Sequence, residues 1–159
     1  MKKLVVMFVA VTMAVAAFAE KGQSLVGFNL NATPSLEKGV KTTHFGIEAR
    51  YLYSFTDGFR GGIDLGYDFK SKELSVFEAG INLNYVFNVS ESFGIYPLIG
   101  GGYASLSVPG ASKGKMYFNV GVGAEYNLTE HFAIDFEIKY QYIKDFARLP
   151  ISLGVAYKF

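Results

Sequence analysis

The sequence contains no cysteine and no tryptophan. Without cysteine, the chain cannot form a disulfide, a thiol nucleophile or a cysteine-based metal site. Its 15 basic and 14 acidic residues nearly cancel, so the composition does not support nucleic-acid binding, which depends on concentrated positive charge. After residue 19, no apolar run approaches the ~20 residues that a membrane-spanning helix needs. If the rest of the chain crosses a membrane, it must therefore cross as a closed β-sheet.

The first nineteen residues have the three parts of a secretory signal peptide. Two lysines follow Met1, the segment Leu4–Phe18 is almost entirely apolar, and Ala17–Ala19 forms a small-x-small cleavage site. The alternative is a short membrane anchor, but this apolar run is shorter than a spanning helix. We therefore expect residues 1–19 to be removed on export and residues 20–159 to form one domain.

Eight stretches of the exported domain alternate between apolar and polar residues, which is the pattern of strands with one apolar face. Each is about as long as a tilted membrane strand, ~9–11 residues, or slightly longer. The predicted strands are Gln23–Ala32, Thr42–Phe55, Phe59–Phe69, Leu74–Phe87, Phe93–Ala104, Met116–Leu128, Phe132–Ile143 and Ile151–Phe159. Short turns alternate with longer connections, of which Ser105–Lys115 is the longest. Pro97 lacks a backbone donor and predicts a bulge or a missing ladder bond.

Every charge within these strands falls on the polar face. A charged side chain on the opposite face would cost ~2–4 kcal/mol at the centre of a bilayer. The aromatic side chains share the apolar face, are too bulky to fill a narrow barrel and gather near the short turns, as in an aromatic girdle. The sequence therefore predicts an all-β fold, an eight-stranded antiparallel up-and-down transmembrane β-barrel with a polar, side-chain-filled interior.

The last strand carries a sequence signal of its own. Ser152, Gly154, Tyr157 and Phe159 match the carboxy-terminal pattern of bacterial outer-membrane barrels. The segment Tyr96–Tyr103 resembles a recurrent stretch in the small eight-stranded barrels, such as those of the A-type and X-type outer-membrane proteins. The resemblance covers the whole chain. It implies export through the periplasm, contact with periplasmic chaperones, recognition by the barrel assembly machinery and insertion into the outer membrane, where we expect a monomer.

Two sets of charged residues are candidates for a site inside the barrel. The turn at residues 56–58 places Arg50 opposite Asp64, which predicts either a gate or, more consistent with a narrow interior, a structural ion pair. The turn at residues 129–131 places Glu125 opposite Asp135. Two such carboxylates raise the question of acid–base catalysis, but no cleft leads a substrate to them. We expect a cation between them, supplied by Lys158, Lys139 or an arginine.

The two histidines give little support for an enzyme. Some related barrels modify lipid A with a histidine and a serine at the outer rim, but His44 follows Thr42 and Thr43, with no serine two positions along its face. His131 lies in a turn at the other end, so the pair has no metal-ligand spacing. We expect neither a metal nor another cofactor.

The longer connections carry an excess of basic residues, which would lie at the level of lipopolysaccharide phosphates. The leading hypothesis is a non-enzymatic outer-membrane protein with a role in envelope structure or surface interaction, in contact with membrane lipid and lipopolysaccharide. A lipid A modifying enzyme and a narrow pore are the alternatives. The basic residues are Lys38, Lys41, Lys70, Lys72, Lys113, Lys115, Lys144 and Arg148.

Overall fold

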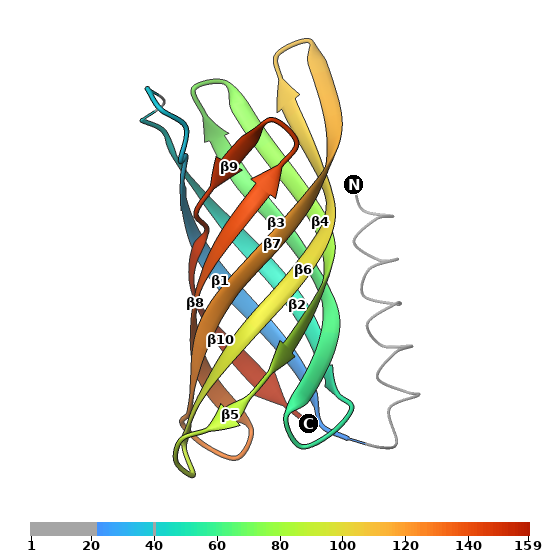
Figure 1. The fold of residues 1–159 in the computed structure, drawn as a ribbon, viewed down its shortest axis with the longest axis vertical. Helices are drawn as coiled ribbons and strands as arrows, with labels where there is room; N and C mark the ends of the chain where they lie inside the picture. Colours follow the sequence, from blue (N-terminus) through green and yellow to red (C-terminus); the bar gives the residue numbers. More distant parts are fainter. Residues whose placement is uncertain (1–21, 40) are drawn as a thin grey trace.

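The computed structural model describes residues 22–39 and 41–159, which form a β-barrel (Figure 1). The predicted signal peptide lies outside the described residues. The strands are β1 (Ser24–Pro34), β2 (Thr43–Ser54), β3 (Phe59–Ser71), β4 (Leu74–Tyr85), β5 (Phe87–Asn88), β6 (Phe93–Val108), β7 (Ala111–Asn127), β8 (Phe132–Ile143), β9 (Phe146–Arg148) and β10 (Ile151–Lys158).

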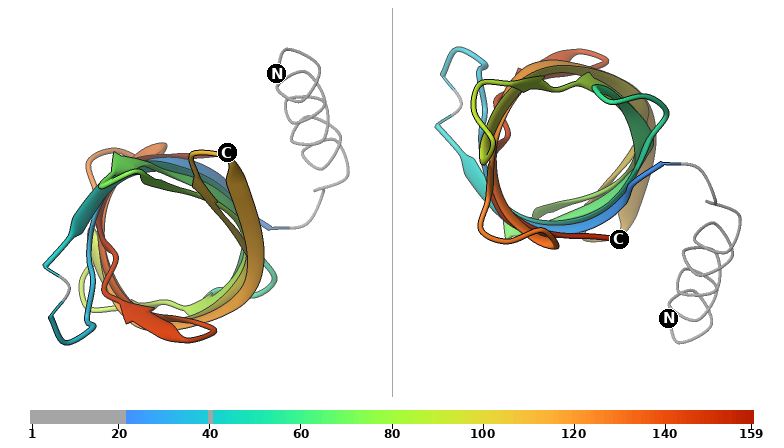
Figure 2. Two further views of the ribbon diagram at one scale, coloured as in Figure 1. Left: turned by 90° about the horizontal axis from the view of Figure 1, so that it is seen from above. Right: turned by 90° about the horizontal axis from the view of Figure 1, so that it is seen from below.

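The sheet closes on itself because the first and last strands pair. β1 lies antiparallel to both β2 and β10, and β10 also pairs with β8. Seen from either end, the ribbon forms a complete ring (Figure 2). The ten segments occupy eight positions, because β5 continues the line of β4 beside β6, while β9 precedes β10 beside β8. The predicted closed, antiparallel, eight-stranded barrel is confirmed.

The distribution of side chains is the reverse of that in a soluble domain. Glu48, Asp135, Glu137 and Lys139 are buried inside the barrel. Large apolar side chains are exposed on the outer wall, and Ile81 is 65% exposed. The alternation therefore places apolar groups towards lipid and polar groups towards the lumen. No helix in the described part of the chain is long and apolar enough to cross a membrane.

The prediction that Ser105–Lys115 forms the longest loop is wrong. β6 and β7 stay paired through this segment as far as Val108 and Ala111, and the turn includes Gly110 at φ +82°. The alternation fades here because a strand outside the bilayer no longer needs an apolar outer face, although its backbone ladder continues. The expected loop Lys144–Arg148 likewise contains β9.

Pro97 produces a missing ladder bond, one of the two outcomes expected from the sequence. Asn84 pairs with Leu98 and Phe87 pairs with Ile95, so the register is the same on both sides of the gap between β4 and β5. Because proline has no N–H to donate, the pairing stops opposite Pro97 and then resumes.

The two ends of the barrel differ. The short turns lie at the end where the carboxyl terminus is found, and the longer hairpins lie at the opposite end (Figure 1). In outer-membrane barrels the short turns face the periplasm. We refer to the hairpin end as the outer end of the barrel and to the other as the turn end.

Candidate functional site

The lumen is crossed by charged side chains in direct contact. Arg50 extends from β2 towards β8, where its Nη2 lies 2.6 Å from Asp135 Oδ2 and its Nη1 contacts Glu137. Gly27 on β1, directly beside Arg50, leaves room for this crossing, since a Cβ there would lie 2.9 Å from Arg50 Nε. The arginine thus connects strands on opposite sides of the closing seam.

Arg50 and Asp64 do lie opposite each other on β2 and β3, but the ion pair suggested by this register is replaced by other contacts. Asp64 accepts hydrogen bonds from the Asn82 amide and, at 3.3 Å, from the Tyr117 hydroxyl. Strand register fixes Cα positions, whereas a long arginine side chain can cross a lumen to a more acidic wall. The prediction that Arg50 pairs with Asp64 is therefore wrong, because Arg50 binds Asp135 and Glu137 instead.

Glu125 and Asp135 are also opposite each other, on β7 and β8. Glu125 binds Lys158 through one oxygen and Arg60 through the other, with 2.9 Å between Arg60 Nη1 and Glu125 Oε2. Asp135 is neutralised by Arg50 instead. The two neighbouring carboxylates thus have separate cationic partners. These partners lower the free-energy cost of burying two like charges side by side.

The group of contacts around Arg50 extends in the same lumen through Glu137 to Lys139 and Tyr96. Lys139 Nζ is 2.9 Å from Glu48 Oε2 and 3.6 Å from Glu137 Oε2. The Tyr96 hydroxyl donates to Glu137 Oε1 at 2.8 Å. Glu48, Glu137 and Tyr96 were not selected from the sequence, although their inward position follows from strand parity. Parity shows which side chains share the lumen, but not which of them touch.

The expectation that Arg148 belongs to a basic outer rim is wrong. It was counted among the outer cations, yet it points into the barrel, where it is buried and binds Asp68, Glu78 and Gln141. Its place on β9, opposite Gln141 on β8, gives it a lumen-facing direction. Lys115 is also engaged, at 3.2 Å from Asp145. Among the outer cations whose side chains the structure describes, Lys38, Lys41, Lys72, Lys113 and Lys144 are exposed, and the side chain of Lys70 lies outside that description.

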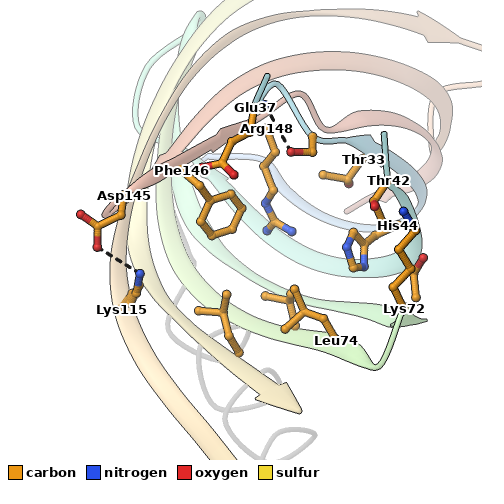
Figure 3. A pocket seen from close by; sticks show the side chains of 14 residues that line it. Thr33, Glu37, Thr42, His44, Lys72, Leu74, Lys115, Asp145, Phe146 and Arg148 are labelled. Carbon is orange, nitrogen blue, oxygen red and sulfur yellow. Dashed lines mark hydrogen bonds and ion pairs between the residues drawn. The ribbon is translucent and has the colours of Figure 1, made fainter. Parts of the chain in front are cut away.

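A cavity of about 480 Å³ opens above Arg148 at the outer end of the barrel. Its apolar wall belongs to β4, β6 and β9, and His44 lies on the other side, directed inward (Figure 3). His44 is only 8% exposed. The described residues contain no group of three metal-ligating side chains.

The residues of the predicted assembly signal occupy both faces of β10. Ser152 and Gly154 face the lumen, and a Cβ on Gly154 would lie 2.7 Å from the backbone oxygen of Phe28, which favours glycine there. Tyr157 and Phe159 are exposed on the outer wall, with ring centroids 6.0 Å apart. Phe159 also exchanges two backbone hydrogen bonds with Ser24, both at 2.9 Å.

The aromatic residues near the turns form contacts that agree with a girdle at the turn end. Tyr157 packs edge-on against Phe132 at 5.1 Å between ring centroids, and Tyr85 lies 4.8 Å from Phe87. Aromatic side chains are enriched at the interface between lipid tails and water, because their amphipathic rings fit at the level of the lipid headgroups.

A closed antiparallel barrel with a polar lumen, an apolar belt and terminal aromatic contacts defines a transmembrane protein of the outer-membrane class. Residues 4–159 match the family described as "Outer membrane protein beta-barrel domain". The chain belongs to this family and is an integral outer-membrane protein. A comparison with curated proteins finds no match.

Solved structures share the fold at low sequence identity. The attachment invasion locus protein Ail of Yersinia pestis is 22% identical, with a TM-score of 0.65 over 87% of this chain and 99% of that one. Neisserial surface protein A is 18% identical, with a TM-score of 0.69 over 87% and 100%. The outer membrane enzyme PagL is 14% identical, with a TM-score of 0.58 over 83% and 97%. At such identities, the likeness concerns the fold alone.

Proposed function

We propose that the protein is a non-enzymatic component of the outer membrane that binds lipopolysaccharide phosphates through the lysines of its outer end. The observation that carries this proposal is the separation of its charges. The basic residues inside the barrel are paired with carboxylates, whereas Lys38, Lys41, Lys72, Lys113 and Lys144 are exposed on the outer hairpins and connections. Exposed cations at this height face the phosphate-bearing headgroups of the outer leaflet.

The ionic clusters of the lumen serve a structural role in this proposal. Removing one member of a buried pair leaves an uncompensated charge, which typically costs ~3–5 kcal/mol. Eight strands enclose a space that side chains just fill, and Arg50, Lys139 and Arg148 each extend across part of it to an acidic partner. These contacts support a filled barrel over a narrow pore.

The position of His44 is the reason for favouring a non-enzymatic role. Its side chain faces the lumen side of β2, away from the lipid in which a lipid A substrate is dissolved. Its Nδ1 has no hydrogen-bond partner among the described residues, so the described contacts give it no serine to activate.

A protein with a similar fold supports the proposal that the outer end binds a polyanion. Ail has been solved in complex with the heparin analogue sucrose octasulfate, a highly sulfated anion. Its barrel resembles this one with a TM-score of 0.62. Phosphates of lipopolysaccharide would present comparable charge to the lysines of this chain.

The proposal is tested by titrating the folded barrel in nonionic detergent micelles with purified lipopolysaccharide by calorimetry. Replacing the five exposed lysines with glutamine should weaken binding, and the loss should be smaller at high salt, where the wild-type interaction is already screened. Glu37→Gln with Glu73→Gln is the matched control of opposite sign, because both acids are exposed at the same end. It should strengthen binding slightly. Equal affinity for all three proteins would reject the proposal.

Export and assembly follow the route proposed for the family. The carboxy-terminal aromatic and the glycine of β10 would be recognised by the barrel assembly machinery after periplasmic chaperones deliver the unfolded chain. The free edges of β1 and β10 pair only within the completed barrel, so an escort before closure would suppress aggregation. We expect the assembled protein to be a monomer.

A further inference from the structure

The cavity at the outer end has two chemically different sides. One side is apolar and continuous with a buried cluster. It consists of Leu74, Val76, Leu106 and Phe146. The opposite side carries Thr33, Thr42, His44 and Lys72. In Figure 3 Phe146 and His44 lie on either side of Arg148. A cavity of about 480 Å³ falls within the ~300–1,000 Å³ typical of small-molecule sites.

His44 gives this cavity an unused hydrogen-bonding group. Its side chain is more than nine-tenths buried, its imidazole is directed into the cavity, and Nδ1 has no partner among the described residues. Leaving a buried polar group without a partner is unfavourable. An incoming ligand with one polar group would recover that free energy.

The charges around the cavity indicate the sign of the polar group. Arg148 at the base is already held by Asp68 and Glu78. Lys115 is already held by Asp145. Lys72 lies beside His44 in the turn after β3, and no carboxylate of the described residues forms an ion pair with it. Glu37 also lines the cavity, but its side chain is exposed to solvent. An anion there would gain a charge-assisted hydrogen bond from Lys72 and a second hydrogen bond from His44.

We propose that this cavity binds a small amphipathic carboxylate. Its apolar body packs on Leu106, Phe146 and the adjoining wall, and its carboxylate lies between His44 and Lys72. The ligand enters from the outer end, since Arg148 and its partners close the base. This site goes beyond the proposed contact with lipopolysaccharide, because it is a cavity for one small molecule rather than a charged surface.

The two histidines of the sequence allow a direct test. In the protein labelled with nitrogen-15 histidine and folded into lipid nanodiscs without lipopolysaccharide, His44 reports on the cavity. His131, whose Nδ1 lies 3.0 Å from the Lys158 carbonyl at the turn end, is an internal reference. The probe is 4-phenylbutyrate, and its neutral isostere 4-phenylbutyramide is the control ligand.

We expect 4-phenylbutyrate to shift the His44 imidazole resonances in a saturable manner and to leave those of His131 unchanged. Lys72→Gln should weaken this binding roughly tenfold, as the loss of a charge-assisted hydrogen bond would. Leu106→Asn should weaken it through the apolar wall. Lys113→Gln, which removes an exposed lysine outside the cavity, should have no effect.

Three results would overturn the proposal. The first is an unsaturable or absent shift of His44. The second is an equal response of both histidines, which would indicate general partition of the probe into the nanodisc. The third is equal affinity of the protein for the carboxylate and the amide, which would exclude an anionic ligand. Binding of 4-phenylbutyrate by the Lys72→Gln variant as tight as by the wild type would have the same meaning.

Discussion

Arg50 and Asp135 connect β2 to β8 across the lumen, with 2.6 Å between Nη2 and Oδ2. Glu137 accepts the other branch of the same guanidinium. All three side chains are buried, so this group links the two sides of the closing seam through the interior as well as through the backbone ladder of β10 and β1.

Replacing Arg50 with methionine should destabilise the barrel by ~3–5 kcal/mol, because two buried carboxylates would lose their shared cation. Equilibrium folding from urea into detergent micelles, followed by circular dichroism, measures the change. Lys113→Met removes a cation from the exposed outer hairpin and should stay within ~0.5 kcal/mol of wild type. A similar small effect for both variants would contradict a structural role for the lumen cluster.

The sequence predicted the strands, their direction and which face of each meets lipid, since a bilayer imposes a strict alternation on every spanning residue. Predictions from the sequence were wrong for residues that do not face the bilayer. Beyond the bilayer, Ser105–Lys115 continues as paired strand without an apolar outer face. Inside the lumen, strand parity shows that Arg50 and Asp64 share the interior. It does not show that Arg50 reaches β8 through space left by Gly27, which depends on the closed ring.

Planar-bilayer recordings should show no steady conductance for the wild-type barrel, because the cross-lumen contacts of Arg50, Lys139 and Arg148 fill its interior. A porin of about 16 strands, whose lumen is an aqueous channel, is the positive control in the same bilayer. A stable open level that scales linearly with salt concentration would favour the narrow-pore alternative.

Ile81→Arg should prevent insertion into bilayers, since Ile81 is 65% exposed on the lipid wall and a mid-bilayer arginine costs ~2–4 kcal/mol. Asn82→Arg is the matched control, because the next residue faces the lumen beside Asp64. It should insert with a smaller loss. Folding into vesicles is followed by the mobility difference between heated and unheated samples. Equal tolerance of both variants would mean that the register of β4 is wrong.

Expression of the protein should leave the lipid A of the host unchanged. His44 faces the lumen, so an acyl chain in the outer leaflet cannot reach its imidazole without entering the barrel. Mass spectrometry of lipid A from cells carrying wild type, His44→Ala or no insert provides the measurement. A lipid A species that appears with wild type and disappears with His44→Ala would establish the enzyme alternative.

Deleting Phe159 should separate stability from recognition. In vitro the variant loses one exposed aromatic ring and the backbone pair with Ser24, so folding into detergent should be only slightly weakened. In cells, surface levels should fall sharply, because the terminal aromatic is the expected assembly signal. Adding one residue after Phe159 should reproduce the defect in cells alone. Normal surface levels for both variants would show that the carboxy-terminal motif is not read.

The pairing of Ser24 with Phe159 places the two ends of the barrel domain side by side. A short linker between them, with new termini opened at the Asp57–Gly58 turn, would give a circular permutant whose sheet retains all its neighbours. The contacts of the β1–β10 seam, which now have the largest sequence separation in the fold, would become local, while β2 and β3 would become the pair with the largest separation. Since folding slows as contacts become more distant in sequence, such a permutant would show which seam sets the rate at which the ring closes.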